Sequence, residues 1–174
     1  IEANASPAVL NGKRWQEVVA EWKQIQADGL SWTAVESFSR HTALIDMVLT
    51  FMVDIGDSYA LTIDPDIDSY YLIDTVMNKS PVALERMGQM RAKGTGILTK
   101  KQMFDQQKIE MSSLMAELNG AIKTLKINLE KTAKYNPDLQ AVLEQATRDY
   151  VDSSEQISKA IVEDMMLGTF AMAP

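Results

Sequence analysis

The sequence predicts an all-α protein: an up-and-down antiparallel bundle of four long helices, or of these four and an additional N-terminal helix. Apolar residues recur every three or four positions along most of the chain, which is the spacing of one helix face. The 8 glycines and 5 prolines mostly fall between these periodic segments, where they end one helix and begin the next. Because 174 residues can bury one hydrophobic core, we expect a single domain over residues 1–174.

Two helices are predicted in the first third of the chain. The first spans about residues 8–28, and Gly29 and Ser31 provide its end and the N-cap of the next. The second continues to about Leu61 and carries an apolar stripe that faces a core. The stripe consists of Val35, Phe38, Thr42, Ile45, Leu49, Met52 and Ile55.

A third helix is predicted to begin at Asp64 and Pro65, an N-cap followed by proline at the first helical position. It should extend to Gly94-Thr95-Gly96, which has the composition of a helix-ending turn. Pro81 lies inside this helix and removes one backbone hydrogen bond. We therefore expect a kink near Met77.

The fourth predicted helix is the most regular one. Thr99, with Gln102 three residues later, has the pattern of a capping box. The apolar residues that follow repeat as positions a and d of a heptad, which predicts a seam against neighbouring helices. The seam residues are Met111, Leu114, Leu118, Ile122, Leu125 and Leu129.

The last helix is predicted from Asn136 and Pro137 toward Gly168, again with a cap followed by proline. Because long helices joined by short turns pack antiparallel, the up-and-down bundle is the simplest architecture. The apolar stripe of this helix comprises Leu139, Val142, Ala146, Tyr150, Ser153, Ile157 and Ile161.

Composition excludes several classes of function. The formal net charge of -7 argues against a nucleic-acid partner, because phosphate binding depends on clustered Lys and Arg. With no cysteine, the chain has no disulfide, zinc–thiolate site or thiol nucleophile.

The most apolar stretch, residues 42–55, contains Asp46 and Asp54, so no membrane-spanning segment is predicted. Without an initiating Met or a signal peptide, the sequence is expected to be either a mature form or a portion cut from a longer protein, and we favour the portion.

No pattern indicates a catalytic residue, a metal site or a cofactor, and we predict that this chain is not an enzyme. The aspartates at 64, 66 and 68 alternate as in a calcium loop, but Ser69 and Thr75 stand where that loop needs Gly and Glu. Capping of a helix N-terminus explains these aspartates better. His41 is the only histidine, which excludes sites with two histidines, and the 11 methionines fit core packing better than haem ligation.

Positive charges offer one route to ligand binding. Arg40, Lys79, Arg86 and Arg91 flank the central predicted helices, and cations between helices can clamp a small carboxylate. The alternative is that these side chains are solvated and pair with surface carboxylates.

A more specific signal lies within residues 41–91, about a third of the chain. It includes His41-Thr42-Ala43-Leu44-Ile45, Asp57-Ser58, and Leu61-Thr62-Ile63-Asp64-Pro65-Asp66-Ile67-Asp68-Ser69-Tyr70-Tyr71-Leu72-Ile73-Asp74, with Pro81 and Gly88 beyond them. This region resembles the extracytoplasmic helical sensor regions of bacterial sensor histidine kinases and methyl-accepting chemotaxis receptors. In those regions a leucine-aspartate-proline turn precedes an aspartate-serine-tyrosine-tyrosine helix start.

The resemblance implies the periplasmic portion of an inner-membrane receptor, flanked in the parent protein by two spanning helices and joined to a kinase or chemotaxis module. It implies a small-molecule or protein stimulus, a homodimer in the parent receptor, and membrane contact only through the flanking helices. A region tethered at both ends needs an even number of antiparallel helices. Either residues 8–61 form one interrupted helix or a further helix precedes them.

The resemblance supplies no binding residues, so candidates for ligand binding are chosen on their chemistry and their nearness to the turn between the second and third helices. They are Arg40, His41, Asp57, Tyr70, Tyr71 and Lys79. The competing hypothesis is an interaction bundle, in which the seam of residues 111–129 pairs with another chain.

Overall fold

The computed structural model describes residues 7–173, and the regular structure of this part of the chain is helical, without a strand. The all-α prediction is thus confirmed. The chain divides into two compact units, Ile1–Ile63 and Asp64–Pro174. The up-and-down four-helix arrangement and the single domain remain predictions. None of the helices in the described residues is long and apolar enough to cross a membrane.

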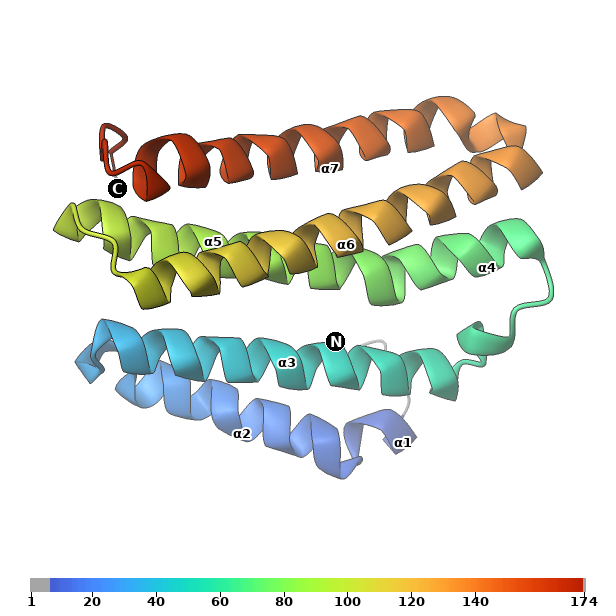
Figure 1. Ribbon diagram of the computed structural model, residues 1–174. Coiled ribbons are helices and arrows are strands. Elements are labelled where there is room, and N and C mark those ends of the chain that lie inside the picture. The colour runs from blue at the N-terminus through green and yellow to red at the C-terminus, as the bar shows by residue number, and fades with distance from the viewer. Residues whose placement is uncertain (1–6, 174) are drawn as a thin grey trace. The chain divides into compact units, whose positions relative to one another are not determined.

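The first unit is a helical hairpin (Figure 1). A short helix α1 (Pro7–Leu10) precedes α2 (Lys13–Asp28), and a 3-10 turn (Gly29–Ser31) leads to α3 (Ala34–Ser58). The hydroxyl of Thr33 caps α3 by accepting the Glu36 N–H at 3.2 Å. Residues 8–61 therefore form two packed helices rather than one interrupted helix.

The core of this unit is small. Val9, Val18 and Phe51 are buried, and the ring of Trp15 stacks on Phe51 at 5.2 Å between centroids. Ion pairs between α2 and α3 flank this core, from Arg14 to Asp54 and from Arg40 to Glu21.

The stripe predicted for α3 is partly wrong. Val35 and Ile45 are exposed, whereas the residues that pack on the core are Leu44, Met47, Val48, Phe51 and Ile55. The physical reason is that most positions between residues 42 and 55 are apolar. Apolar spacing alone therefore does not determine which face of the helix is turned inward.

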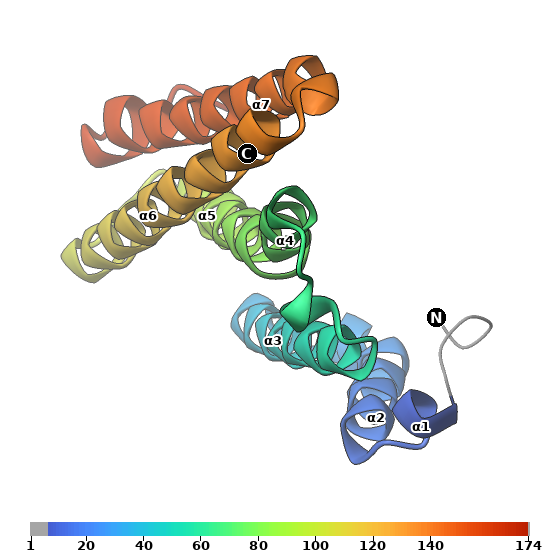
Figure 2. The same ribbon diagram turned by 90° about the vertical axis from the view of Figure 1, so that its right-hand side faces the viewer.

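The second unit consists of three long antiparallel segments (Figures 1 and 2). The first contains α4 (Ile67–Asp74), a π-helical turn (Thr75–Lys79) and α5 (Ser80–Lys100). The second is α6 (Asp105–Tyr135). The third contains a 3-10 turn (Pro137–Leu139), α7 (Gln140–Ala160) and a second π-helical turn (Ile161–Met166). In both views α6 lies against the first segment and against α7.

Where a kink is predicted near Met77, the segment contains the π-helical turn. Pro81 has no N–H to donate, and the chain adapts by widening the preceding turn so that the Ser80 N–H reaches the Thr75 carbonyl oxygen. The start of this segment differs from the prediction. The carboxylate of Asp64 accepts the Asp66 N–H and the Ser69 hydroxyl, so it shapes the turn, and the helix begins only at Ile67.

Gly94-Thr95-Gly96 does not end a helix, because α5 continues to Lys100. Gly94 is buried under Met165, and a Cβ at this position would lie 2.9 Å from Met165 Cε. Glycine here allows close packing against the flexible end of the Met165 side chain and does not form a turn. The capping box at Thr99 is also wrong: its hydroxyl donates to the Thr95 carbonyl oxygen within α5. The start of α6 is instead capped by Gln107, whose side chain accepts the Phe104 N–H.

The core of the second unit follows the predicted seam, since all six seam residues of α6 are buried. On α7 most of the predicted stripe also packs on the core, namely Leu139, Ala146, Tyr150, Ile157 and Ile161, and two positions differ. Leu143 and Ser154 are buried, whereas Val142 and Ser153 are exposed. Each of these buried residues is the immediate neighbour of an exposed stripe position, about 100° away around the helix.

The adjacent residues Val142 and Leu143 provide a direct test of how α7 packs. Leu143 is 7% exposed and Val142 is 61% exposed. We expect Leu143→Ala to lower the free energy of unfolding by about 2–5 kcal/mol, and Val142→Ala by about 0.5 kcal/mol or less. Urea unfolding of both variants measures the difference. A larger loss in Val142→Ala would mean that position 142, as predicted from the sequence, is the buried one.

Candidate functional site

Pairs of polar side chains connect the first segment of the second unit to α6 at points spread along their interface. They occur in strict antiparallel order: as the residue numbers rise along α4 and α5, those of their partners on α6 fall. The pairs are Asp68 with Asn136, Tyr71 with Lys131, Asp74 with Asn128, Arg86 with Glu117, and Lys93 with Glu110. We call this set the polar register.

The pair at Asp74 lies deepest. Asn128 is 7% exposed and donates from Nδ2 to Asp74 Oδ2 at 2.7 Å. Asn78 donates to the other oxygen at 2.8 Å, and Lys79 Nζ lies 3.4 Å from Oδ2. Burial acts to raise the pKa of Asp74, but the hydrogen bonds from Asn78 and Asn128 and the charge of Lys79 outweigh it, so the pKa is lowered. Asp74 is therefore held as a carboxylate.

A second set of contacts lies near the C-terminal end of α6. Asn136 Nδ2 donates to Asp68 Oδ2 at 2.9 Å and lowers the pKa of Asp68, helped by the backbone N–H of Ser69. Thr132 is fully buried and donates to the Asn128 carbonyl oxygen at 3.0 Å. Asn128, Thr132 and Asn136 are four residues apart, so they share one face of α6. Sequence reasoning missed them, although their spacing continues the apolar seam.

The structure places three of the predicted ligand-binding residues beside this register. The hydroxyl of Tyr71 accepts from Lys131 Nζ at 2.7 Å, and Tyr70 meets the Tyr71 ring edge-on at 5.2 Å between centroids. Lys79 pairs with Asp74. These side chains take part in contacts within the unit, which leaves few of their polar groups for a ligand.

The other three predicted residues lie in the first unit, on α3. Arg40 pairs with Glu21 at 2.9 Å and lies over the Trp32 ring. His41 Nδ1 lies 2.7 Å from the Ser37 carbonyl oxygen. Asp57 accepts the Thr62 hydroxyl at 3.1 Å. At 1.5 Å rise per residue, Arg40 and Asp57 are about 25 Å apart along the helix, too far for one small ligand.

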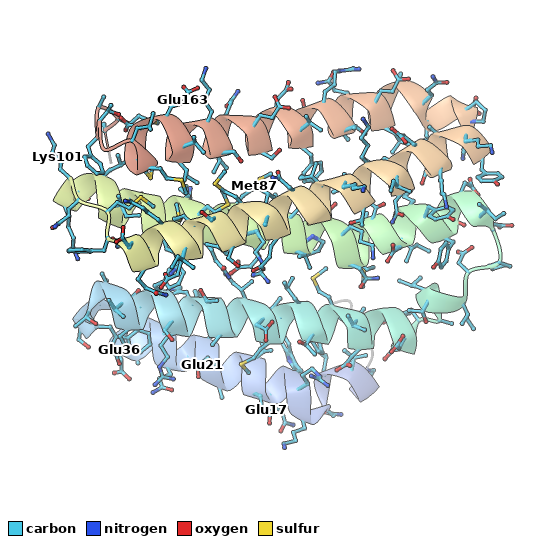
Figure 3. The ribbon with its side chains drawn as sticks, in the orientation of Figure 1. Glu17, Glu21, Glu36, Met87, Lys101 and Glu163 are labelled. Atoms are coloured by element: carbon cyan, nitrogen blue, oxygen red, sulfur yellow. The ribbon has the colours of Figure 1, made fainter. Side chains whose placement is uncertain are left out.

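A groove of about 500 Å³ lies in the second unit between α5 and the α7 segment. Apolar side chains form most of its lining, and Met87, labelled in Figure 3, is one of them. On α5 they include Leu84, Met87 and Leu98, and on the opposite wall Ile157, Ile161 and Met165. Pockets of this size and character are typical of small-molecule sites. No pattern in the sequence indicates this groove.

The C-terminal segment forms part of the groove wall, through Met172 and Ala173. Its position depends on Asp164 in the second π-helical turn. The Asp164 carboxylate accepts the Thr169 hydroxyl and the Ala171 N–H at 2.6 Å each, and the Met172 N–H at 3.0 Å. The hydrogen bond from Thr169, followed by those from the two backbone amides, lowers the pKa of Asp164.

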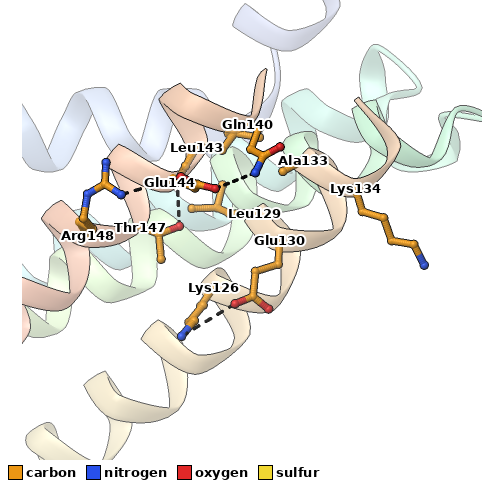
Figure 4. A pocket seen from close by; sticks show the side chains of 10 residues that line it. All are labelled: Lys126, Leu129, Glu130, Ala133, Lys134, Gln140, Leu143, Glu144, Thr147 and Arg148. Atoms are coloured by element: carbon orange, nitrogen blue, oxygen red, sulfur yellow. Dashed lines mark hydrogen bonds and ion pairs between the residues drawn. The ribbon is translucent and has the colours of Figure 1, made fainter. Parts of the chain in front are cut away.

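A second hollow, of about 490 Å³, lies between α6 and α7 (Figure 4). Its charged side chains largely satisfy one another. Lys126 pairs with Glu130, while Glu144 accepts from Gln140 and pairs with Arg148. This hollow therefore has weaker grounds for ligand binding than the apolar groove. In the described residues no three His, Cys, Asp or Glu side chains are grouped so that they could hold a metal ion.

The Asp74–Asn128 pair can be tested by a double-mutant cycle. Removing either partner leaves a poorly satisfied polar group, so Asp74→Ala and Asn128→Ala should couple by about 0.5–3 kcal/mol in the free energy of unfolding. The matched control is the exposed pair Lys126 and Glu130 on the same helix, for which we expect about 0.5 kcal/mol or less. Equal coupling in the two cycles would contradict a structural role for the polar register.

Acid should weaken the second unit. Asp68, Asp74 and Asp164 all have a pKa below the ordinary value of 3.8. Their stabilising contribution is fully present above that value and is lost as the pH falls through the lowered pKa of the folded state. The free energy of unfolding, measured in urea at a series of pH values, should therefore decrease below about pH 4. In Asp74→Asn the free energy of unfolding should decrease less steeply with falling pH. An unchanged slope would mean that the Asp74 carboxylate does not contribute to the decrease.

No protein-family model, curated protein or solved structure matches this chain. The resemblance of residues 41–91 to bacterial sensor regions therefore stays a prediction. The contacts of the chain's own residues are the remaining basis for a functional hypothesis.

Proposed function

We propose that this chain is the extracytoplasmic sensor region of a bacterial transmembrane receptor, most simply a sensor histidine kinase. In this proposal a stimulus binds in the apolar groove and shifts the α7 segment, which passes the change to the rest of the receptor. The main observation in support of the proposal is which segments form the two walls of the groove. One side is α5, and the other is the α7 segment with the C-terminal segment that follows it.

The two walls of the groove are held in different ways. The segment that contains α5 is tied to α6 by the polar register. The side-chain hydrogen bonds of α7, such as those of Gln145 and Arg148, stay within that helix, and α7 packs through apolar residues such as Leu143 and Ile157. Apolar contacts are non-directional, so they permit small shifts that polar pairs resist.

A ligand can transmit a change only if it binds two packings with different affinity. A groove with one fixed wall and one adjustable wall meets that requirement, because movement of α7 changes its width. The π-helical turn at Ile161–Met166 adds a local irregularity in the adjustable wall. Such turns are frequent at functional sites.

A chemotaxis receptor would use the same geometry with a different cytoplasmic module. A protein–protein interaction bundle is the second candidate. The six seam residues between 111 and 129 are buried within the unit, so its surface would be formed by exposed apolar side chains elsewhere. Ile109 and Ile127 on α6 and Val142 on α7 are between 42% and 64% exposed. Such a surface also suits the homodimer that we propose for the parent receptor.

The proposal is tested by thermal unfolding of the purified chain with organic acids, amino acids, aromatic acids and divalent metals. A ligand at a hundred times its Kd should stabilise the fold by about 2.7 kcal/mol, which raises the midpoint by about 5–10 °C. We expect one chemical class to give this dose-dependent rise. A midpoint that responds to no compound and tracks only protein concentration would instead support the interaction bundle.

A further inference from the structure

We propose that the apolar groove binds an amphipathic monocarboxylate, with its hydrocarbon part between the walls and its carboxylate on Arg91. This inference rests on the proposed function, since it names the chemical class of the stimulus. It is drawn from the charge on the groove rim, the open space above Gly88 and the methionines of the walls.

Arg91 is set apart from the other cations considered for ligand binding. Arg40, Lys79 and Arg86 each pair with a carboxylate, from Glu21, Asp74 and Glu117 respectively. Within residues 7–173 Arg91 makes no such pair, and it is the one charged residue in the groove lining. It is the candidate that remains able to bind a carboxylate from outside the chain.

The position of Arg91 suits a single carboxylate at the edge of an apolar site. Its guanidinium can donate two parallel hydrogen bonds to one carboxylate. Thr95 lies one turn further along the same face of α5 and also lines the groove, so its hydroxyl offers a further donor. A second negative charge on the ligand would have no partner there and would meet an acidic chain of net charge -7. The site therefore favours monoanions.

The interior of the groove suits a flexible hydrocarbon. Four methionines, Met87, Met90, Met165 and Met172, line it, and their unbranched side chains adapt to the shape of an apolar ligand. A Cβ built on Gly88 meets no atom within 4 Å, so space is open in the middle of the α5 wall. Met172, held by Asp164, adds an apolar contact at the C-terminal end.

The test compares decanoate with decanol, each below its aggregation limit, by thermal unfolding and by titration calorimetry on the full chain. Decanoate should bind saturably. Decanol lacks the charge, so its Kd should be higher by a factor of about ten or more. In Arg91→Met the advantage of decanoate over decanol should disappear. In the control Arg148→Met, which changes an arginine outside the groove, the advantage should persist.

Gly88→Leu tests the location without disturbing the core. Leucine is a better helix former than glycine, and its Cβ has open space here, so the variant should fold with an unchanged or higher midpoint but lose decanoate binding. Gly96→Leu is the matched control, since Gly96 also lies on α5 with open space but outside the groove lining, and binding should survive.

Equal binding of decanoate and decanol to the wild-type chain, or full binding by Gly88→Leu, would overturn the inference. If another class of compound raises the midpoint and Gly88→Leu abolishes that response, the monocarboxylate is wrong while the sensor proposal stands. If no compound in either series has an effect, the sensor proposal fails together with the inference.

Discussion

The polar register between the first segment of the second unit and α6 is the constraint on which the rest of that unit depends. An apolar heptad seam such as residues 111–129 repeats itself, so by itself it would allow α6 to slide by one turn. Sliding would separate Asp74 from Asn128 and leave buried polar groups without partners. The register thus selects one alignment of two long helices, and this alignment fixes α5 as a stable wall.

The α7 segment completes the unit under a looser constraint. It packs through Leu143, Ile157 and Ile161, and its last residues form a π-helical turn. Asp164 in that turn fastens the C-terminal segment by three hydrogen bonds to its carboxylate. The unit therefore combines a helix pair of fixed register with a third helix whose position is set by apolar packing. This difference gives the groove its proposed role in signalling.

Features that depend on local sequence were predictable, and those that depend on distant contacts were not. The heptad seam of α6 and a helix irregularity before Pro81 follow from spacing and backbone chemistry. Gly94 was misread because its role depends on Met165, some seventy residues later in the chain. The six candidate ligand residues had suitable chemistry, but most of their polar groups are engaged by partners such as Glu21 and Lys131, which pattern reasoning could not identify. The groove itself arises only when α5 and α7 are packed.

The methionines that line the groove also expose it to redox chemistry. The chain has no cysteine to react first with an oxidant. Met172 is half exposed at the mouth of the groove, so its thioether is open to peroxide. Conversion to the sulfoxide would add a polar oxygen to an apolar wall, next to the segment that Asp164 fastens. The oxidation state of this one sulfur would then change the polarity of the groove wall, independently of any change in the amino-acid sequence.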